Sequence, residues 1–208
     1  MVKPSKSYEH PVSAASGELR IIGGSWRGRK LRFPALPGLR PSPDRVRETL
    51  FNWLGPTLPG AHCLDLFAGS GALGLEALSR GASSCWFVDN ANAACRSIEE
   101  HLSLLRADGG RVVNADSTRW LELRPSTAPA FDVVFLDPPF RQGLLEACCD
   151  RLERGDWLAQ DALIYLEAGA DETPPALPAN WLLHRDKRAG QVAYRLFHRA
   201  AGALSSPW

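Results

Sequence analysis

A glycine-rich stretch of the sequence has the spacing of a nucleotide-binding turn. It reads DLFAGSGALG from Asp65 to Gly74, a Gly-x-Gly-x-x-Gly pattern between a short apolar run and a helix-like run. Glycines in that context let the backbone turn tightly and approach a ligand closely. Asp89 follows Gly69 by 20 residues, where a carboxylate can accept hydrogen bonds from both hydroxyls of a ribose. The pattern predicts a site for a nucleoside-containing cofactor.

The turn is compatible with two cofactors, NAD and S-adenosylmethionine. Asp65 lies four residues before Gly69, where a carboxylate would repel a pyrophosphate but suit a cofactor tail that carries an ammonium group. This favours S-adenosylmethionine. Asp116 could accept a hydrogen bond from the exocyclic amine of an adenine, or it could only cap the following helix. The predicted cofactor-binding residues are Asp65, Phe67, Ala68, Gly69, Gly71, Asp89, Asn90 and Asp116.

A second segment whose residues could take part in a reaction is Asp137-Pro138-Pro139-Phe140, which follows a buried strand. The two prolines fix the backbone and remove two N–H donors, so the Asp137 carboxylate and the Pro138 carbonyl can converge as acceptors. Two hydrogen bonds from an exocyclic base nitrogen would hold it in line with a sulfonium methyl group. Phe140 offers a face on which a flipped-out base can stack. We therefore predict methylation of a base amine, with Asp137, Pro138, Pro139 and Phe140 as the catalytic residues.

The elements that position these motifs alternate along the chain. From residue 61 onward, short apolar runs alternate with helical periods, a pattern typical of right-handed βαβ units in a mostly parallel α/β sheet. Strands are expected at His62–Phe67, Cys85–Asp89, Arg111–Ala115, Phe131–Asp137, Ala162–Glu167, Trp181–Arg188 and Gln191–His198. Helices are expected near 72–80, 91–106, 117–123 and 141–154. Only two residues separate the last two strands, which predicts an antiparallel hairpin at the sheet edge.

The amino-terminal part of the chain is basic. Residues 20–50 contain eight basic and two acidic side chains, a net charge of +6, whereas the residues after them carry a net charge of −5. Positive charge of this density is expected where a protein meets phosphates, although a solvated hairpin can have the same composition. The predicted RNA-binding residues are Arg27, Arg29, Lys30, Arg32, Arg45 and Arg47.

This basic extension is expected to contain a β-hairpin and a helix. Leu19–Ile22 and Ser25–Phe33 would be its two arms, because Gly23-Gly24 supplies the positive φ angles of a tight turn. A helix is then expected to start with Ser42 as its N-cap and Pro43 in its first turn. The arms would form an RNA-binding ribbon that reaches beyond the catalytic domain.

Length and composition limit the remaining possibilities. The 208 residues leave room for one domain and a small appendage, and 45% of them are hydrophobic, enough for a sizeable core. The five cysteines include no CxxC pair, so we expect neither disulfides nor a metal. No apolar run approaches the ~20 residues that cross a bilayer, and no secretory signal is readable. We expect a cytoplasmic monomer without a membrane partner.

Several longer segments carry a family resemblance. DLFAGSGALGLEALSRGA, DPPF, LRIIGGSWRGRKL, PSPDRVRETLFNWL, NWLLHR and AGQVAYRL, within residues 19–199, together resemble the bacterial small-subunit ribosomal RNA guanine-N2 methyltransferases of the RsmD type. The first two motifs are shared with many amino-methyltransferases, whereas the ribbon and RVRETLFNWL are specific. The resemblance implies a seven-stranded class I methyltransferase fold and methyl transfer from S-adenosylmethionine to the 2-amino group of a guanine in 16S rRNA. It also implies an assembled or partly assembled 30S subunit as partner.

The resemblance assigns roles to individual residues and to parts of the chain. Asp65, Gly69 and Gly71 would bind the cofactor, with Asp89 on its ribose, and Asp137, Pro138 and Phe140 would contact the target base. The expected organisation is a tail at 1–18, an RNA-binding extension at 19–58, a methyltransferase domain at 59–199 and a second tail at 200–208.

Three other functions compete with this hypothesis. An adenine-N6 methyltransferase acting on DNA or RNA would share the two short motifs, but a DNA enzyme would need a sequence-reading domain that 208 residues hardly accommodate. An NAD-dependent oxidoreductase would need a proton donor beside the glycine turn, and none is apparent. A non-catalytic RNA-binding assembly factor would have no need of an intact Asp137 and glycine pattern.

Overall fold

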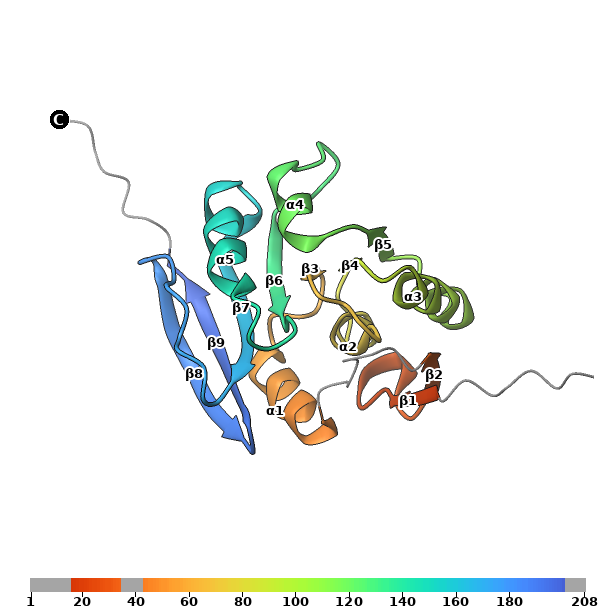
Figure 1. Ribbon diagram of the computed structural model, residues 1–208. Coiled ribbons are helices and arrows are strands. Elements are labelled where there is room, and N and C mark those ends of the chain that lie inside the picture. Colours follow the sequence, from red (N-terminus) through yellow and green to blue (C-terminus); the bar gives the residue numbers. More distant parts are fainter. Residues whose placement is uncertain (1–15, 35–42, 201–208) are drawn as a thin grey trace, which may run out of the picture.

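The structure is a computed structural model that describes residues 16–34 and 43–200 (Figure 1). A small ribbon consists of β1 (Ser16–Arg20) and β2 (Lys30–Pro34). The strands of the large sheet are β3 (His62–Asp65), β4 (Ser84–Asp89), β5 (Gly110–Asn114), β6 (Phe131–Leu136), β7 (Leu158–Gly169), β8 (Trp181–Ala189) and β9 (Val192–Arg199). The helices are α1 (Asp44–Leu54), α2 (Ala72–Ser79), α3 (Asn92–Leu105), α4 (Ser117–Glu122) and α5 (Leu144–Arg154).

The large sheet has the strand order β5-β4-β3-β6-β7-β9-β8. The pairs from β5 to β7 are parallel, whereas β9 runs antiparallel to both β7 and β8. This confirms the predicted fold class, a mostly parallel sheet that ends in an antiparallel hairpin. The chain runs outward from β3 to β5 and then returns to β6 on the other side of β3. Ligands of open α/β sheets bind at such a reversal, beyond the carboxyl ends of the strands.

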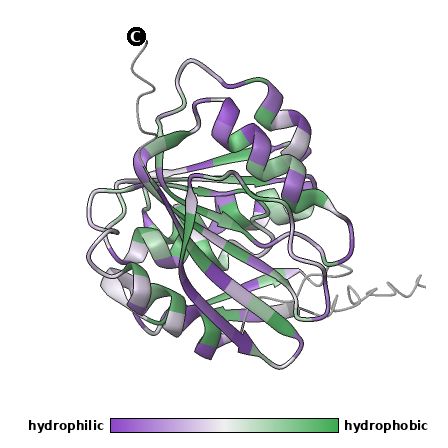
Figure 2. Cartoon of the chain, turned by 90° about the vertical axis from the view of Figure 1, so that its left-hand side faces the viewer, coloured by the Kyte–Doolittle hydropathy of each residue, from purple (hydrophilic) through white to green (hydrophobic). Residues whose placement is uncertain are grey.

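The sheet is covered on both faces, and this explains the apolar runs of its inner strands. In β6, Val133 and Phe135 belong to the core that includes residues of α1, α2 and α3. Val134 and Leu136 belong to the core that includes residues of α4 and α5. Figure 2 shows the result, with hydrophobic colour along the inner strands and hydrophilic colour on the outer faces of the helices.

The amino-terminal ribbon differs from the predicted hairpin in two respects. Its arms pair antiparallel from Ser16↔Pro34 to Arg20↔Lys30, but a nine-residue connection that contains a 3₁₀ helix, Gly24–Trp26, replaces the tight Gly23-Gly24 turn. The ribbon is also no free arm, because it lies beside α2 and α3 (Figure 1). Four of its apolar side chains are buried in the α1–α3 core: Leu19, Ile21, Leu31 and Phe33.

Several element boundaries shift by a few residues from their predicted positions. β7 starts at Leu158 instead of Ala162, with a register irregularity where it begins to pair with β6. α5 starts at Leu144, after Gly143 with a φ of 66°. α1 starts at Asp44 with Pro43 in the N-cap position, and the predicted cap Ser42 lies outside the described residues.

Three further properties concern the whole described part of the chain. Within it, no helix is long and apolar enough to cross a membrane. Residues 16–34 and 43–200 also contain no cluster of three or more His, Cys, Asp or Glu side chains arranged to hold a metal ion. All five cysteines are buried and unpaired, and burial raises the pKa of each thiol.

Candidate cofactor and base site

The glycine turn connects the carboxyl end of β3 to the first turn of α2. Gly69 and Gly71 have φ angles of 53° and 77°, a region that L side chains rarely adopt. Gly74 is required for a different reason, because a Cβ atom there would lie 2.2 Å from the ring of Phe87. The turn therefore brings α2 into close contact with the sheet, as the glycine pattern predicts.

Asp89 ties the end of β4 to this turn. Its Oδ2 atom accepts a hydrogen bond from the Gly69 N–H at 2.8 Å, and its Oδ1 atom accepts one from the Ala91 N–H at 2.8 Å. A carboxylate has about four lone-pair sites, so two remain for the hydroxyls of a ribose. The shape of the turn thus depends on the same side chain that was predicted to bind the ribose.

Asp65 is a buried carboxyl group at the carboxyl end of β3. It accepts a hydrogen bond from the Gly74 N–H at 3.0 Å. Burial raises its pKa to about 7, the Gly74 hydrogen bond counteracts this effect, and the charge of Asp89 adds to it. A buried carboxylate is stabilised by a nearby cation. The turn, Asp89 and Asp65 therefore fit a nucleoside cofactor with an ammonium-bearing tail, such as S-adenosylmethionine.

The raised pKa of Asp65 predicts a pH dependence of stability. Between its ordinary pKa of 3.8 and about 7, the folded protein holds a proton that the unfolded chain has released. The free energy of unfolding should therefore fall as the pH rises through this window, by up to about 1.4 kcal/mol per pH unit from this group. Urea unfolding at pH 5, 6, 7 and 8 should show that the stability of Asp65→Asn increases relative to that of the wild type as the pH rises. A constant difference between the two proteins would contradict the assignment.

The other predicted cofactor residues lie around the same strand ends. Asp116 caps α4, because its Oδ1 atom accepts hydrogen bonds from the Arg119 N–H at 2.9 Å and the Thr118 hydroxyl at 2.6 Å. These bonds lower its pKa. The capping role is thus present, and contact with an adenine remains a prediction. Phe67 is half-buried, Ala68 is buried and donates its N–H to the Val88 carbonyl, and Asn90 is exposed after β4.

The Asp137 turn lies beside the glycine turn because β3 and β6 are neighbours. Their pairing places Asp65 opposite Phe135, and the Leu66 N–H donates to the Phe135 carbonyl at 3.1 Å. Asp137 is half-buried two residues beyond Phe135, and Phe140 is 43% exposed. The two motifs that the sequence singled out thus meet at the reversal point of the sheet.

A pocket of about 200 Å³ opens next to the Asp137 turn. Its lining includes Pro138, Pro139, Phe140, Glu167, Pro174 and Pro175. The mixture of proline and phenylalanine surfaces with a carboxylate is suited to a flat aromatic group that carries hydrogen-bond donors.

Sequence reasoning missed Glu167, which lies on β7. This side chain is 3% exposed and accepts a hydrogen bond from the Tyr165 hydroxyl at 2.8 Å. Burial and the neighbouring Glu167 raise the pKa of Tyr165, with a further contribution from Asp137, so the tyrosine remains a donor. The signal that could have revealed it was a glutamate at the end of the apolar strand predicted at Ala162–Glu167.

Most of the predicted RNA-binding residues lie at the surface. Arg27, Arg29 and Arg32 are exposed, as is Arg45 on α1. Lys30 is also exposed and forms an ion pair with Glu18 at 2.8 Å. Arg47 does not fit the prediction: it is 1% exposed, so its guanidinium group cannot reach RNA in this structure. Arg47 points toward the core, as the buried apolar residues of α1 do.

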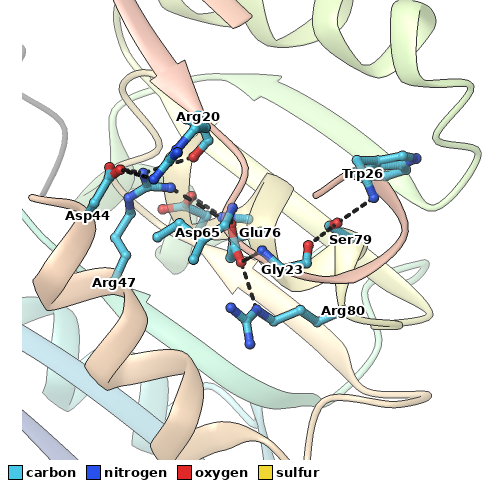
Figure 3. Close-up of polar contacts among 11 residues, drawn as sticks. Arg20, Gly23, Trp26, Asp44, Arg47, Asp65, Glu76, Ser79 and Arg80 are labelled. Carbon is cyan, nitrogen blue, oxygen red and sulfur yellow. Dashed lines mark hydrogen bonds and ion pairs between the residues drawn. The ribbon is translucent and has the colours of Figure 1, made fainter. Parts of the chain in front are cut away.

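Arg47 is part of a buried network that joins α1, α2 and the ribbon (Figure 3). Its Nη2 atom donates to Asp44 at 2.6 Å and to the Arg20 carbonyl at 3.0 Å. Glu76 on α2, which is fully buried, lies 3.9 Å from Arg47 and 2.7 Å from Arg80. The network thus pairs Arg47, which was predicted to bind RNA, with a buried glutamate inside the protein.

Glu76 also holds the ribbon in place. Its two oxygens accept hydrogen bonds from the Ile22 and Gly23 N–H groups, both at 2.8 Å. Next to it, Ser79 accepts from the Trp26 N–H at 3.0 Å and donates to the Gly23 carbonyl at 2.6 Å (Figure 3). The connection of the ribbon is therefore fixed on α2, the helix that begins at the glycine turn.

The chain is similar in sequence and in fold to known proteins. Residues 19–198 match the family model described as Conserved hypothetical protein 95. The Escherichia coli (strain K12) protein named Ribosomal RNA small subunit methyltransferase D is 52% identical over 191 residues, which cover 92% of this chain and 95% of that protein. The solved structure of the Escherichia coli protein yhhF, a proposed methyltransferase, matches with a TM-score of 0.81 and 50% identity, covering 89% and 99% of the two chains.

A more distant solved structure shares the fold. It is SMU.776, a proposed methyltransferase complexed with SAH, with a TM-score of 0.64 and 16% identity. The match covers 92% of this chain and 58% of that chain.

Proposed function

The chain belongs to the family described as Conserved hypothetical protein 95, and from this premise we propose that it methylates the 2-amino group of a guanine in 16S rRNA. At the coarser level it is an S-adenosylmethionine-dependent methyltransferase of small-subunit ribosomal RNA. The observation that carries the proposal is the β3–β6 pairing, which brings the glycine turn and the Asp137 turn to one edge of the sheet. A cofactor bound at the first turn would thus lie next to an acceptor-rich turn.

The residues at this edge can perform the methyl transfer by positioning. When bound, S-adenosylmethionine supplies a methyl group on a positively charged sulfur. The two N–H groups of the amine donate hydrogen bonds to the Asp137 carboxylate and the Pro138 carbonyl. These bonds orient the lone pair of the amine toward that methyl group. Phe140 stacks on the ring of the base. As the N–C bond forms and the C–S bond breaks, Asp137 can hold the proton that the amine releases.

The substrate is proposed to be the RNA within an assembled or partly assembled 30S subunit, which a monomer of this protein meets in the cytoplasm. The exposed basic side chains of the ribbon support an RNA substrate, because a net negative body would by itself repel a polyanion. The ribbon and α1 would form the RNA-binding extension, and the large sheet with its helices the catalytic part.

The ribbon charges predict a specific change in salt dependence. In a variant with Arg27, Arg29, Lys30 and Arg32 all replaced by alanine, the slope of log binding constant against log salt should flatten by up to about 2.8 units. The reason is that each neutralised phosphate of a single strand contributes about 0.7. Binding of S-adenosylhomocysteine and the melting temperature should not change, because these side chains are exposed. The measurement is 30S or rRNA binding between 50 and about 200 mM salt.

A matched control removes exposed arginines from the body of the protein. Arg119→Ala and Arg154→Ala should leave the slope unchanged. If instead the ribbon variant runs parallel to the wild type, the RNA contact must be sought on the basic edge strand β8 around Arg185, Lys187 and Arg188.

The experiment that tests the function is mass spectrometry of 16S rRNA from cells that lack this protein. One N2-methylguanosine should be missing, and expression of the wild-type protein should restore it, whereas Asp137→Ala should not. Loss of an N6-methyladenosine instead would favour the adenine-specific alternative. An unchanged set of modifications would favour the non-catalytic assembly factor.

A further inference from the structure

A groove of about 500 Å³ lies between β2 of the ribbon and α3, which are neighbours in Figure 1. We propose that this groove holds the phosphodiester backbone of the substrate RNA, with Arg32 on one wall and Arg96 on the other. The inference rests on the proposed function, because it extends the RNA contact from the ribbon onto the catalytic part of the chain. It follows from the shape, the charge and the position of the groove.

The two walls of the groove come from one strand and from one stripe of a helix. Both neighbours of Arg32 on β2 are buried in the core, so the alternation of the strand turns Arg32 to the opposite side. Three residues of α3, Asn92, Arg96 and Glu100, line the other wall. They lie four residues apart and therefore share one face of the helix. Arg96 occupies the middle of this stripe.

A buried histidine holds the two walls together. His101 on α3 is 5% exposed, and its Nε2–H donates to the Arg32 carbonyl at 2.9 Å. Burial lowers the pKa of His101, so the imidazole is neutral at pH 7 and adds no charge to the groove. A groove whose walls are fixed before binding loses little conformational entropy when it takes up a ligand.

The charge of the two arginines is available to a ligand. Both side chains are exposed, and neither forms an ion pair within the part of the chain that the structure describes. Glu18, which lies opposite Arg32 on β1, pairs with Lys30 instead. The lining thus combines two guanidinium groups with a single carboxylate, that of Glu100. A guanidinium group matches the geometry of a phosphate, to which it can donate two parallel hydrogen bonds.

The groove leads from the ribbon toward the cofactor turn. Its lining includes Asn92 and Ala93, which begin α3 shortly after Asp89. No side chain caps this end of α3, so the positive end of the helix adds to the attraction of an anion. None of the described residues that line the groove is aromatic, which suits the backbone of an RNA strand better than its bases.

The test compares two arginines of the same helix. Binding of 16S rRNA is measured between 50 and about 200 mM salt. Arg96→Gln should flatten the slope of log binding constant against log salt by about 0.7, the contribution of one single-strand phosphate, and should weaken binding about 5-fold near ~0.1 M salt. The matched control is Arg106→Gln, which changes an exposed arginine at the other end of α3, outside the groove. This variant should keep the wild-type slope.

Two neighbouring glutamates test the opposite sign. Glu100→Gln removes the carboxylate of the groove and should strengthen rRNA binding. Glu99→Gln removes an exposed carboxylate from the next position of α3, outside the lining, and should change the affinity less. All four side chains are exposed, so the melting temperature and the affinity for S-adenosylhomocysteine should stay at their wild-type values.

Several outcomes would overturn the role of the groove. They are a wild-type slope in Arg96→Gln, an equal flattening in Arg106→Gln, or a weaker affinity of Arg96→Gln for S-adenosylhomocysteine, which would assign the groove to the cofactor. An effect seen with 30S subunits but absent with protein-free 16S rRNA would assign it to a protein of the subunit instead.

Failure of the proposed function is distinguishable from these results. If the wild type binds rRNA but transfers no methyl group to a guanine, the proposed function fails whatever the slopes are. If the wild type methylates the guanine and Arg96→Gln runs parallel to it, only the role of the groove fails.

Discussion

Replacing Asp137 with alanine is expected to reduce the rate of methyl transfer by more than 100-fold while leaving the affinity for S-adenosylhomocysteine nearly unchanged. Asp137 directly follows β6, which pairs with β3, the strand that leads into the glycine turn. Its proposed contact is to the amine of the target base. Losing a group that stabilises the transition state costs about 10²–10³ in kcat. Single-turnover methylation of 30S subunits and calorimetry with the cofactor product measure the two quantities.

An aspartate away from the site provides the matched control. Asp150 is exposed on α5 and pairs with Arg154, so Asp150→Ala should have wild-type activity. If Asp137→Ala keeps more than about a tenth of the wild-type turnover, a loss below ~1.4 kcal/mol, the role assigned to Asp137 is wrong. A large loss of cofactor affinity in this variant would instead place Asp137 in the cofactor site.

The sequence predicted the inner strands of the large sheet well because they are buried on both faces. Such strands appear as continuous apolar runs, and the glycine and proline motifs mark their ends. β4 and β6 therefore lie within one residue of their predicted bounds. β7 is longer than predicted because its first residues pair through an irregular register, which no local pattern records. The predicted tight turn of the ribbon was wrong. Hydrogen bonds with side chains of α2 hold the connection that Gly23-Gly24 was expected to close alone.

The residues of the candidate site also differ in whether the sequence could predict them. The glycine turn and the Asp137 turn depend on residues that are neighbours in sequence, and both could be found from spacing. Glu167 depends on the register between β6 and β7, and a single glutamate in an apolar strand gives only a weak signal. Arg47 was assigned to the surface from its charge, although the i, i+4, i+8 spacing of Val46, Leu50 and Leu54 leaves its face undecided.

Glu76→Ala is the substitution expected to cost the most stability. It leaves the buried guanidinium of Arg47 with one carboxylate fewer and removes the acceptor of two backbone N–H groups, those of Ile22 and Gly23. Breaking a buried charge network in this way costs about 3–5 kcal/mol. Because Asp44 still pairs with Arg47, we expect about 3 kcal/mol, which corresponds to a fall in melting temperature of roughly 6–12 °C for a chain of this size. Urea and thermal unfolding measure both values.

Two further variants apportion this cost. Glu76→Gln keeps an oxygen for the ribbon N–H groups but loses the charge, so it should be less destabilising than Glu76→Ala. Glu99→Ala removes an exposed glutamate from α3 and should stay within about 0.5 kcal/mol of the wild type. A loss below about 1 kcal/mol in Glu76→Ala would show that the ribbon is held mainly by its apolar side chains and by the hydrogen bonds of Ser79. In that case Leu19, Ile21, Leu31 and Phe33, together with Ser79 and not Glu76, would connect the ribbon to the helix that begins at the glycine turn.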